Sequence, residues 1–435
     1  VVCCKPGYLG FVGKEGIMVE VKKKIDLTVL MLISMALAVI AGLVVGEPMT
    51  QLQFIGDIFF ALIQMSIPIF VLATVVKSVG GLTPQTLSGI AGKGVIIFIV
   101  SSGIAAALGI ALGVIFQPGA SAGTDAVMAA AGYDGEAVEM MTIQDTLTGF
   151  FGTNIVASLA NGSMIQIIIF AVALGLVISF WRQTHDECKL YDIISETSDL
   201  LLNIIRGVMT IAPIGIFCYV SSMVASVGMT VLVPLAKYFL VMALGMVIMF
   251  VAYCIICGAY CRVNPVKLAG KLVRTLVTAF TTISSAVTLP TAMEDAKKKI
   301  GIREDVCDVL LPLGVPLNSN GVAIHMTVDA LCIAQLYGIA FGPSDFLTCW
   351  LICTMISFVN AATPGASLVS LTMMIPALGL PMEAIGIFGG LEYPTGATRT
   401  PLNVTGDVFA AMLVAGPDGI DHDIFDGKKE YQEAA

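Results

Sequence analysis

Charged residues are scarce in this sequence. Only 12% of its 435 residues are charged and 57% are hydrophobic, whereas about a quarter of the residues of a soluble domain are charged. The scarcity excludes an ordinary water-soluble domain. Its apolar runs of about 20 residues or more are typical of spanning helices. The composition therefore predicts an all-α polytopic membrane protein in the lipid bilayer.

Metal-binding and nucleic-acid-binding patterns are also missing. The chain has three His, and its eleven Cys are scattered, which is atypical of a structural metal site. Cys254 and Cys257 form C-x-x-C, but inside an apolar run, where packing is expected. No basic patch suited to nucleic acid occurs. No Ser/His or Asp/Asp constellation suggests an intramembrane hydrolase, so no enzyme activity is predicted.

The first 17 residues do not have a helical pattern. Cys3 and Cys4 are adjacent, and four Gly follow before Met18 and the run VEVKKK. We expect the native chain to begin at Met18. The first apolar run is long and lacks a small-residue cleavage site, so no cleavable signal peptide is predicted.

The apolar runs predict eight spanning helices and two re-entrant hairpins. The fourth helix is expected to break at Asn161 and Gly162. The helices are expected at about 25–46, 52–79, 92–116, 147–181, 192–226, 230–261, 304–339 and 384–415, and the hairpins at 265–298 and 343–382.

The basic residues lie in alternate loops. Lys22, Lys77 and Lys428 fall on one side under this topology, whereas no basic residue lies between Lys93 and Arg182. Since cytoplasmic loops are rich in Lys and Arg, both termini are predicted to be cytoplasmic, in a plasma (bacterial inner) membrane. The first hairpin must then re-enter from the cytoplasm and the second from outside. Two opposed hairpins are typical of inverted repeats.

Two hydrophobic regions are interrupted in the same way. TTISSAVTLP (281–290) is followed by GVPLNSNG (314–321), and AATPGASLVS (361–370) by PLNVTGD (401–407). Irregular backbone at membrane depth is tolerated only where protein or a water-filled cavity surrounds it. Such interruptions in corresponding positions of two halves indicate the binding site of a transporter.

The last apolar run contains an unusual polar stripe. Glu392, Arg399, Asn403 and Asp407 recur at spacings of seven, four and four residues, so they share one helix face. In a structural interpretation, these charges neutralise one another and only hold helices together. In a functional interpretation, the planar guanidinium of Arg399 binds a carboxylate. Asp407, Asn403 and carbonyls freed by a helix break at Asn318 then bind Na⁺.

These segments resemble a known family. RTPLNVTGD (399–407) is similar to the R-T-x-x-N-V-x-G-D signature of the dicarboxylate/amino acid:cation symporters, the glutamate/aspartate transporters. SSAVTLP (284–290) resembles their first hairpin tip, and ATPGAS (362–367) their second. LPLGVPLNSNG (311–321) stands where the family has N-M-D-G-T. The resemblance covers about residues 25–415.

The resemblance implies an elevator-type transporter that assembles as a homotrimer. A scaffold would hold a mobile transport domain that carries the solute across the bilayer. The implied segments are a leader and cytoplasmic segment (1–24), scaffold helices 1–2 (25–91), helix 3 of the transport domain (92–117), an acidic loop with scaffold helices 4–5 (118–228), the rest of the transport domain (229–416) and a cytoplasmic tail (417–435).

The resemblance also implies a set of binding residues. Substrate would contact Ser284, Ser285, Thr363, Gly365, Ser367, Arg399, Thr400 and Asn403. Three Na⁺ sites would use Gly314, Asn318, Asn403 and Asp407 for the first, Ser357 and Asn360 for the second, and Ser101, Ser102, Asn318 and Asn320 for the third.

The chain departs from the family pattern at four positions. Asn320 stands where the family has Asp, and Val322 where it has Thr. Pro316 replaces a Thr beside the second sodium site. Gly396 replaces the Asp that pairs with a substrate ammonium. The third sodium site is therefore expected to lose a charge, and the case for an amino acid substrate weakens.

We hypothesise sodium-coupled symport of a small anionic solute, either an acidic amino acid such as glutamate or aspartate or a C4-dicarboxylate. His325 and Asp329, one turn apart, are either a satisfied core pair or a proton relay that replaces the third sodium. The alternatives are therefore a proton-coupled symporter, a neutral amino acid (serine/threonine-like) symporter of the same family, or an anion channel.

Overall fold

The computed structural model describes residues 27–81, 89–120, 148, 151–185, 187–227, 229–358, 366–382, 384–389 and 391–431. Residues 1–17, and with them the predicted start at Met18, lie outside these ranges. The described residues are almost entirely helical, with one antiparallel bridge between Ile302 and Ile420. The all-α prediction is confirmed for this part of the chain.

The first half of the chain contains a helical group that begins at the N-terminal end of the described residues. Its elements are α1 (Leu27–Val45), the 3₁₀-helix η1 (Glu47–Leu52), α2 (Gln53–Gln64), α3 (Ile67–Gly80), α4 (Ile90–Phe116), α7 (Ile155–Asn161), α8 (Met164–Trp181), α9 (Lys189–Met209) and α10 (Ala212–Val227).

The second half holds the two segments predicted to be hairpins and the longest described helix. Its elements are α11 (Met229–Tyr260), α12 (Pro265–Lys271), α13 (Val273–Thr282), α14 (Ser285–Glu294), the π-helix η2 (Asp295–Ile300), α15 (Glu304–Leu317), α16 (Asn320–Leu336), α17 (Pro343–Ser357), α18 (Ala366–Ala377), α19 (Ala384–Gly389), α20 (Glu392–Ala415), the 3₁₀-helix η3 (Pro417–Gly419) and α21 (His422–Asp426).

Several predicted spans are divided by breaks. The expected break after Asn161 is confirmed, because Gly162 ends α7 in the left-handed region with φ of 67°. The predictions of continuous helices at 52–79 and 192–226 were wrong. New helices begin at Ile67 and Ala212, each with a proline in its first two positions, Pro68 and Pro213. Proline has no N–H and clashes with the preceding turn, so it ends the earlier helix.

Two described helices are each long and apolar enough to cross a bilayer without interruption. They are α4 and the Val233–Tyr260 part of α11. Shorter apolar helices, among them Ile169–Trp181 and Pro213–Ser226, accompany them.

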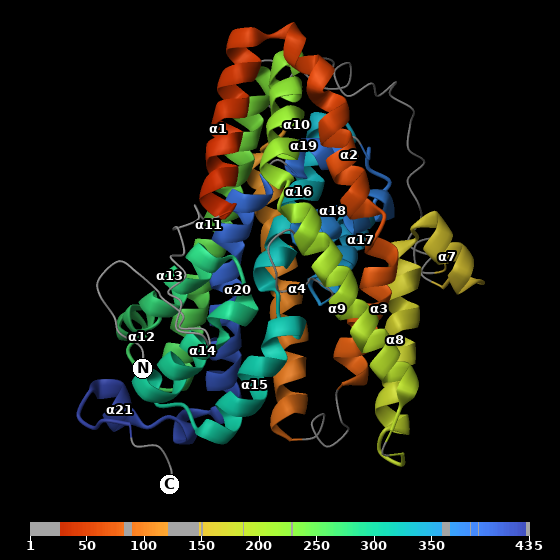
Figure 1. Cartoon of the computed structure of the whole chain (residues 1–435). Helices are drawn as coiled ribbons and strands as arrows, with labels where there is room; N and C mark the ends of the chain where they lie inside the picture. The colour runs from red at the N-terminus through yellow and green to blue at the C-terminus, as the bar shows by residue number, and fades with distance from the viewer. Residues whose placement is uncertain are drawn as a thin grey trace, which may run out of the picture.

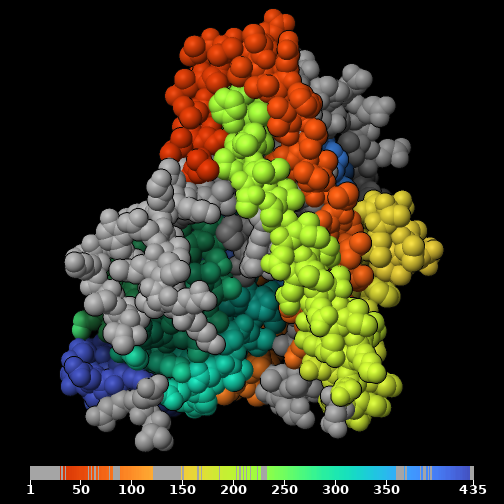
Figure 2. Space-filling view, in the orientation of Figure 1, coloured from red at the N-terminus to blue at the C-terminus, as the bar shows by residue number. Residues whose placement is uncertain are grey.

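The helices pack mainly in two groups. One group pairs α1 with α10, α2 with α10, and α3 with α8 and α9. The other gathers α4, α11, α13, α14, α15, α17 and α20 around α16 and one another. Figure 1 shows α1, α2 and α10 at one end and α12–α15 with α21 at the other. In Figure 2 the yellow-green residues of α9 and α10 form a diagonal strip beside α2 and α3.

Helix α16 lies in the middle of the second group. Every one of its residues except Gln335 is buried. Small residues of α4 permit this closeness, since a Cβ added at Gly109 or Gly113 would strike Thr327 or Leu331. Such stripes let helix backbones approach each other in membrane proteins. Polar residues of α16 are therefore enclosed by protein.

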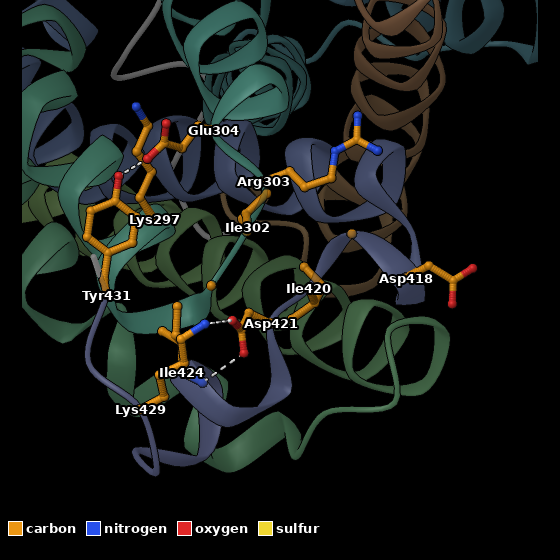
Figure 3. A pocket seen from close by; sticks show the side chains of 12 residues that line it. Lys297, Ile302, Arg303, Glu304, Asp418, Ile420, Asp421, Ile424, Lys429 and Tyr431 are labelled. Atoms are coloured by element: carbon orange, nitrogen blue, oxygen red, sulfur yellow. Dashed lines mark hydrogen bonds and ion pairs between the residues drawn. The ribbon is translucent and has the colours of Figure 1, made fainter. Parts of the chain in front are cut away.

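The chain folds back after α20 and docks on the base of the first hairpin. The main-chain N–H of Arg303 donates to Gly419 O at 3.1 Å, and that of Asp421 donates to Gly301 O at 2.8 Å. Phe425 is buried, with Lys271 4.9 Å from its ring centre. Figure 3 shows the surface cavity of about 560 Å³ that Ile302, Ile420, Tyr431 and their neighbours line here. The segment predicted as a cytoplasmic tail (417–435) therefore joins α20 to the hairpin through its described residues.

Asp421 starts the short helix of this contact. Its carboxylate accepts the N–H groups of Asp423 (3.0 Å) and Ile424 (3.2 Å). These bonds, the one from Ile424 above all, hold the pKa of the Asp421 carboxyl below its usual value. Because the pKa is lower in the folded state, the cap contributes its full stabilisation to the folded protein above the unfolded pKa of about 4. This stabilisation is lost as the pH falls through the pKa of the folded state.

We expect Phe425→Ala to detach the tail, because it removes a buried ring from the contact. A loss of about 2–4 kcal/mol of local stability is expected for such a truncation. Limited proteolysis after residue 416 and thermal unfolding of the detergent-purified protein measure it. Lys428→Ala, which removes only exposed ion pairs, is the control. Equal proteolysis rates in the two variants would contradict the docking.

Candidate functional site

The predicted break in the seventh helix is present. α15 ends at Leu317, Asn318 (φ −125°, ψ 93°) and Ser319 (φ −122°, ψ 60°) are non-helical, and α16 begins at Asn320. Pro316 stands in the last turn of α15, where its missing N–H weakens the helix. Asn318 and Ser319 are both buried. The irregular backbone is thus surrounded by protein, as membrane depth requires.

Asp407 of α20 lies against this break. Its carboxylate accepts a hydrogen bond from Asn318 Nδ2 at 2.7 Å and is 2% exposed. A Cβ added at Gly314 would strike the carboxylate, so only glycine lets the two approach. No cationic side chain among the described residues forms an ion pair with Asp407. A buried carboxylate is costly unless a cation or a proton neutralises it.

The oxygens around Asp407 fit a small hard cation. Asn318 Oδ1 is buried and has no hydrogen-bond partner among the described residues. It lies on the same amide that donates to Asp407. Carboxylate, amide and carbonyl oxygens are the ligands that such cations take. Gly314, Asn318 and Asp407 of the predicted first sodium site are therefore brought together.

Asn403 of the predicted set links α20 to α16. Its Oδ1 accepts the main-chain N–H of Gly321, at 2.8 Å, in the first turn of α16. A Cβ on Gly321 would lie 2.6 Å from Arg399 O, so α16 and α20 touch here. Arg399 is 3% exposed and Asn403 5%. Arg399, Asn403 and Asp407 of the polar stripe therefore face the protein interior.

Asn320 joins three helices through one amide. Its Oδ1 accepts from Ser101 at 3.2 Å and Ser102 at 3.0 Å, both on α4. Its Nδ2 donates to the hydroxyl of Tyr253 on α11. Ser101, Ser102 and Asn320 of the predicted third sodium site thus meet, while Asn318 turns to Asp407. Tyr253 was not predicted from the sequence. Its hydroxyl group within an apolar run was the one indication of a polar role.

The first hairpin tip lies beside α20. Ser284 caps α14, where its Oγ accepts Val287 N–H at 3.3 Å, and Ser285 begins that helix. Both are buried. The preceding residue, Ile283, packs on Gly396 of α20. The tip predicted to meet substrate therefore lies one turn from Arg399 and Thr400.

A family comparison agrees with this arrangement. The model of the sodium:dicarboxylate symporter family matches residues 27–416, nearly the whole chain. The chain belongs to the sodium:dicarboxylate symporter family. The resemblance read from four motifs is confirmed.

Individual symporters of known name are similar over most of their length. A proton/glutamate-aspartate symporter of Escherichia coli (strain K12) is 32% identical over 369 residues, 83% of this chain and 84% of the relative. A proton/sodium-glutamate symport protein of Bacillus caldotenax is 29% identical over 91% of this chain and 96% of its own. A C4-dicarboxylate transport protein of Brucella anthropi is 27% identical over 88% of each. This family member is a transporter and not an enzyme.

The second hairpin tip of the symporter is only partly described. Thr363, Gly365 and Asn360 lie outside the described residues. Ser367 is buried in α18. Ser357, at the end of α17, donates its hydroxyl to Thr354 O at 2.7 Å, and Thr400 donates to Gly396 O at 2.7 Å. Both hydroxyl oxygens keep lone pairs for a ligand.

The symporter also buries a histidine–carboxylate pair. His325 Nε2 lies 3.2 Å from Asp329 Oδ2 on α16, with side chains 3% and 0% exposed. The Tyr238 ring centre is 6.3 Å from that of His325. The pair predicted from a spacing of four residues is therefore formed in the core.

We expect Asp407→Asn to weaken sodium binding at least tenfold, since the carboxylate that accepts from Asn318 is lost (~1.4 kcal/mol per tenfold change). Sodium-dependent thermal stabilisation of the purified protein, without substrate, measures this. Asp308→Asn, at an exposed carboxylate paired with Lys297, is the control. A sodium response as large in Asp407→Asn as in Asp308→Asn would contradict the assignment.

Proposed function

We propose that the protein is a cation-coupled symporter that carries small dicarboxylate anions across the plasma (bacterial inner) membrane. One observation carries the proposal. Arg399 and Asp407 lie on one buried face of α20, enclosed by the broken α15–α16 helix and the first hairpin tip. Eight residues separate them, about 12 Å along the helix, so a solute and a cation can bind at once.

Arg399 supplies the solute end of the site. A buried guanidinium presents a planar fork that matches a carboxylate. We expect the solute also to meet Thr400 on the same helix and Ser284 and Ser285, which start the helix after the tip that packs on α20. The names of the relatives, glutamate-aspartate symporter and C4-dicarboxylate transport protein, both denote solutes with two carboxylates. This chemistry favours a dicarboxylate over a neutral amino acid.

Asp407 supplies the cation end. Its oxygens, Asn318 Oδ1 and the Gly314 carbonyl form a set suited to Na⁺. The third site has no carboxylate, and its Asn320 amide is satisfied by Ser101, Ser102 and Tyr253. A neutral network leaves no charge to attract a cation. We therefore expect the protein to couple transport to fewer sodium ions than the family pattern implies.

An elevator motion is the proposed mechanism. Helices α1–α3 and α8–α10, within 25–91 and 118–228, would form the scaffold of a homotrimer. α4 and α11–α20, within 92–117 and 229–416, would move with the solute. Contacts between the groups, such as α1 with α20 and α8 with α18, are fewer than those within each. For both hairpins and both termini we propose the orientation that the positive-inside pattern predicts.

Proton coupling is the second candidate, and one observation favours it. The His325–Asp329 pair is buried in α16, the helix that begins after the break. Histidine changes charge near neutral pH more readily than other side chains, and ionisable residues inside a membrane protein commonly serve proton or ion pathways. Two of the relatives are named as proton-coupled.

Uptake of labelled succinate and aspartate into proteoliposomes tests the function. We expect saturable uptake of at least one of them, driven by an inward sodium gradient. Arg399→Gln should reduce uptake at least about 30-fold, since losing a desolvated charge pair costs 2 kcal/mol or more. Arg399→Lys, which keeps the charge without the fork, should be intermediate. Robust serine uptake with neither acid transported would overturn the proposal.

His325→Gln tests the proton candidate. If protons are coupled, the variant should lose uptake driven by a pH gradient and retain uptake driven by sodium, because glutamine cannot carry the proton. Measurements with each gradient imposed alone separate the two. Unchanged uptake under a pH gradient would leave the pair as a structural element of α16.

A further inference from the structure

Two cysteines of α17 lie one turn apart with their thiols in contact. Cys349 and Cys353 are separated by four residues, so they share one face of the helix. Their sulfur atoms are 4.0 Å apart, and a thiol hydrogen bond runs between them. Both residues are fully buried. Two sulfur atoms therefore face each other in a space that is closed to water.

The same spacing on α11 gives a different arrangement. Cys257 and Cys261 are also four residues apart and fully buried. Their thiols donate to main-chain oxygens of α20, to Phe409 O at 3.6 Å and to Met412 O at 3.5 Å. Those two sulfur atoms hold one helix against another. A spacing of four residues does not by itself pair two sulfur atoms, and their direct contact distinguishes α17.

The donor atoms decide which ion fits between the two sulfur atoms of α17. Two bonds of about 2.3 Å, the usual length from zinc to a thiolate, span this separation at an angle of roughly 120°. A disulfide would need the sulfur atoms about half as far apart, so the helix would have to distort. One bridging ion leaves the helix as it is.

The number of donors excludes the common metal ions. Zinc takes four ligands in structural sites, and the part of the chain that the structure describes holds no group of three or more His, Cys, Asp or Glu side chains suited to a metal. Hard cations such as Ca²⁺ and Mg²⁺ take oxygen ligands. Thiol sulfur selects soft ions such as Cu(I), which are stable with two sulfur ligands. A soft monovalent ion therefore fits best.

Binding of such an ion leaves the buried site neutral. One thiol loses its proton to bulk water, and the ion then bonds to this thiolate and to the intact second thiol. The positive charge of the ion and the negative charge of the thiolate cancel. The cost of burying a net charge is therefore avoided.

The pair lies one turn from a residue of the predicted second sodium site. Ser357 follows Cys353 by four residues, about 6 Å along the axis, and is buried in the last turn of α17. Helix α17 packs on α16, α4 and α18 (Figure 1). Protein interiors are close-packed, so an ion added on the enclosed face would displace α17 and, with it, Ser357.

We propose that Cys349 and Cys353 form a two-sulfur site for a single soft monovalent metal ion of the Cu(I) class, and that an ion bound there inhibits transport. The site lies on a different helix from Arg399 and Asp407. The inhibition rests on the proposed function, whereas binding of the ion does not depend on it.

Silver, Ag(I), is a redox-stable probe of this chemistry. The purified, reduced protein is titrated with silver nitrate in chloride-free buffer without solute, and the ions bound per chain are counted by mass spectrometry. Cys349→Ser and Cys353→Ser should each bind about one ion fewer than the unmodified protein, because a two-coordinate ion needs both sulfur atoms. Thermal unfolding without silver verifies that each variant is folded.

Cys261→Ser is the matched control, since its thiol contacts Met412 O instead of a second sulfur. This variant should bind as much silver as the unmodified protein. The inference is overturned if Cys353→Ser binds as many ions as the unmodified protein, or if Cys261→Ser loses as many as Cys353→Ser.

Uptake of labelled succinate into proteoliposomes tests the inhibition. Silver should inhibit the unmodified protein, and Cys353→Ser should need roughly tenfold more silver for the same inhibition, because one thiol holds the ion less tightly than two. Equal sensitivity of the two proteins would overturn the inhibition. If no solute is transported even without silver, the proposed function is wrong, and the count of bound ions still tests the site.

Discussion

A buried carboxylate facing a broken helix is the constraint on which the rest of the structure depends. Asp407 sits 2.7 Å from Asn318 with 2% of its surface exposed. Burial of a charge without a compensating cation is expensive, and the cation of the proposed function would offset that cost. The non-helical residues between α15 and α16 bring the Asn318 amide to this carboxylate, and Gly314 leaves room for it.

The neighbouring Asn320 shows the opposite solution. Ser101, Ser102 and Tyr253 satisfy its amide from three directions, and a fully satisfied polar network stabilises a unique packing. The two asparagines are two residues apart. Asn318 Oδ1 has no hydrogen-bond partner among the described residues, whereas the Asn320 amide joins three helices. The difference lies in which helices face each side chain.

Both ends of the first hairpin are tied to α20. At the tip, Ile283 packs on Gly396, and at the base the tail after α20 pairs with residues 301–303. Asp295 adds a buried link within the hairpin through Thr275, at 2.7 Å, and Lys299, at 2.7 Å. The hairpin and α20 can therefore move as one body, which an elevator motion would require.

The sequence by itself determined the helical class, the family, the break at Asn318 and the stripe that carries Arg399 and Asp407. Those features are local, since hydropathy, proline and the spacing of charges act within one segment. Breaks before Pro68 and Pro213 were readable in the same way and were missed. Only the tertiary structure decided that Asn403 caps α16, that Tyr253 reaches Asn320, that the tail docks on the hairpin and that Ile283 fills the place left by Gly396. Each is a contact between segments far apart in the chain, and no local pattern encodes which side chain will stand opposite another.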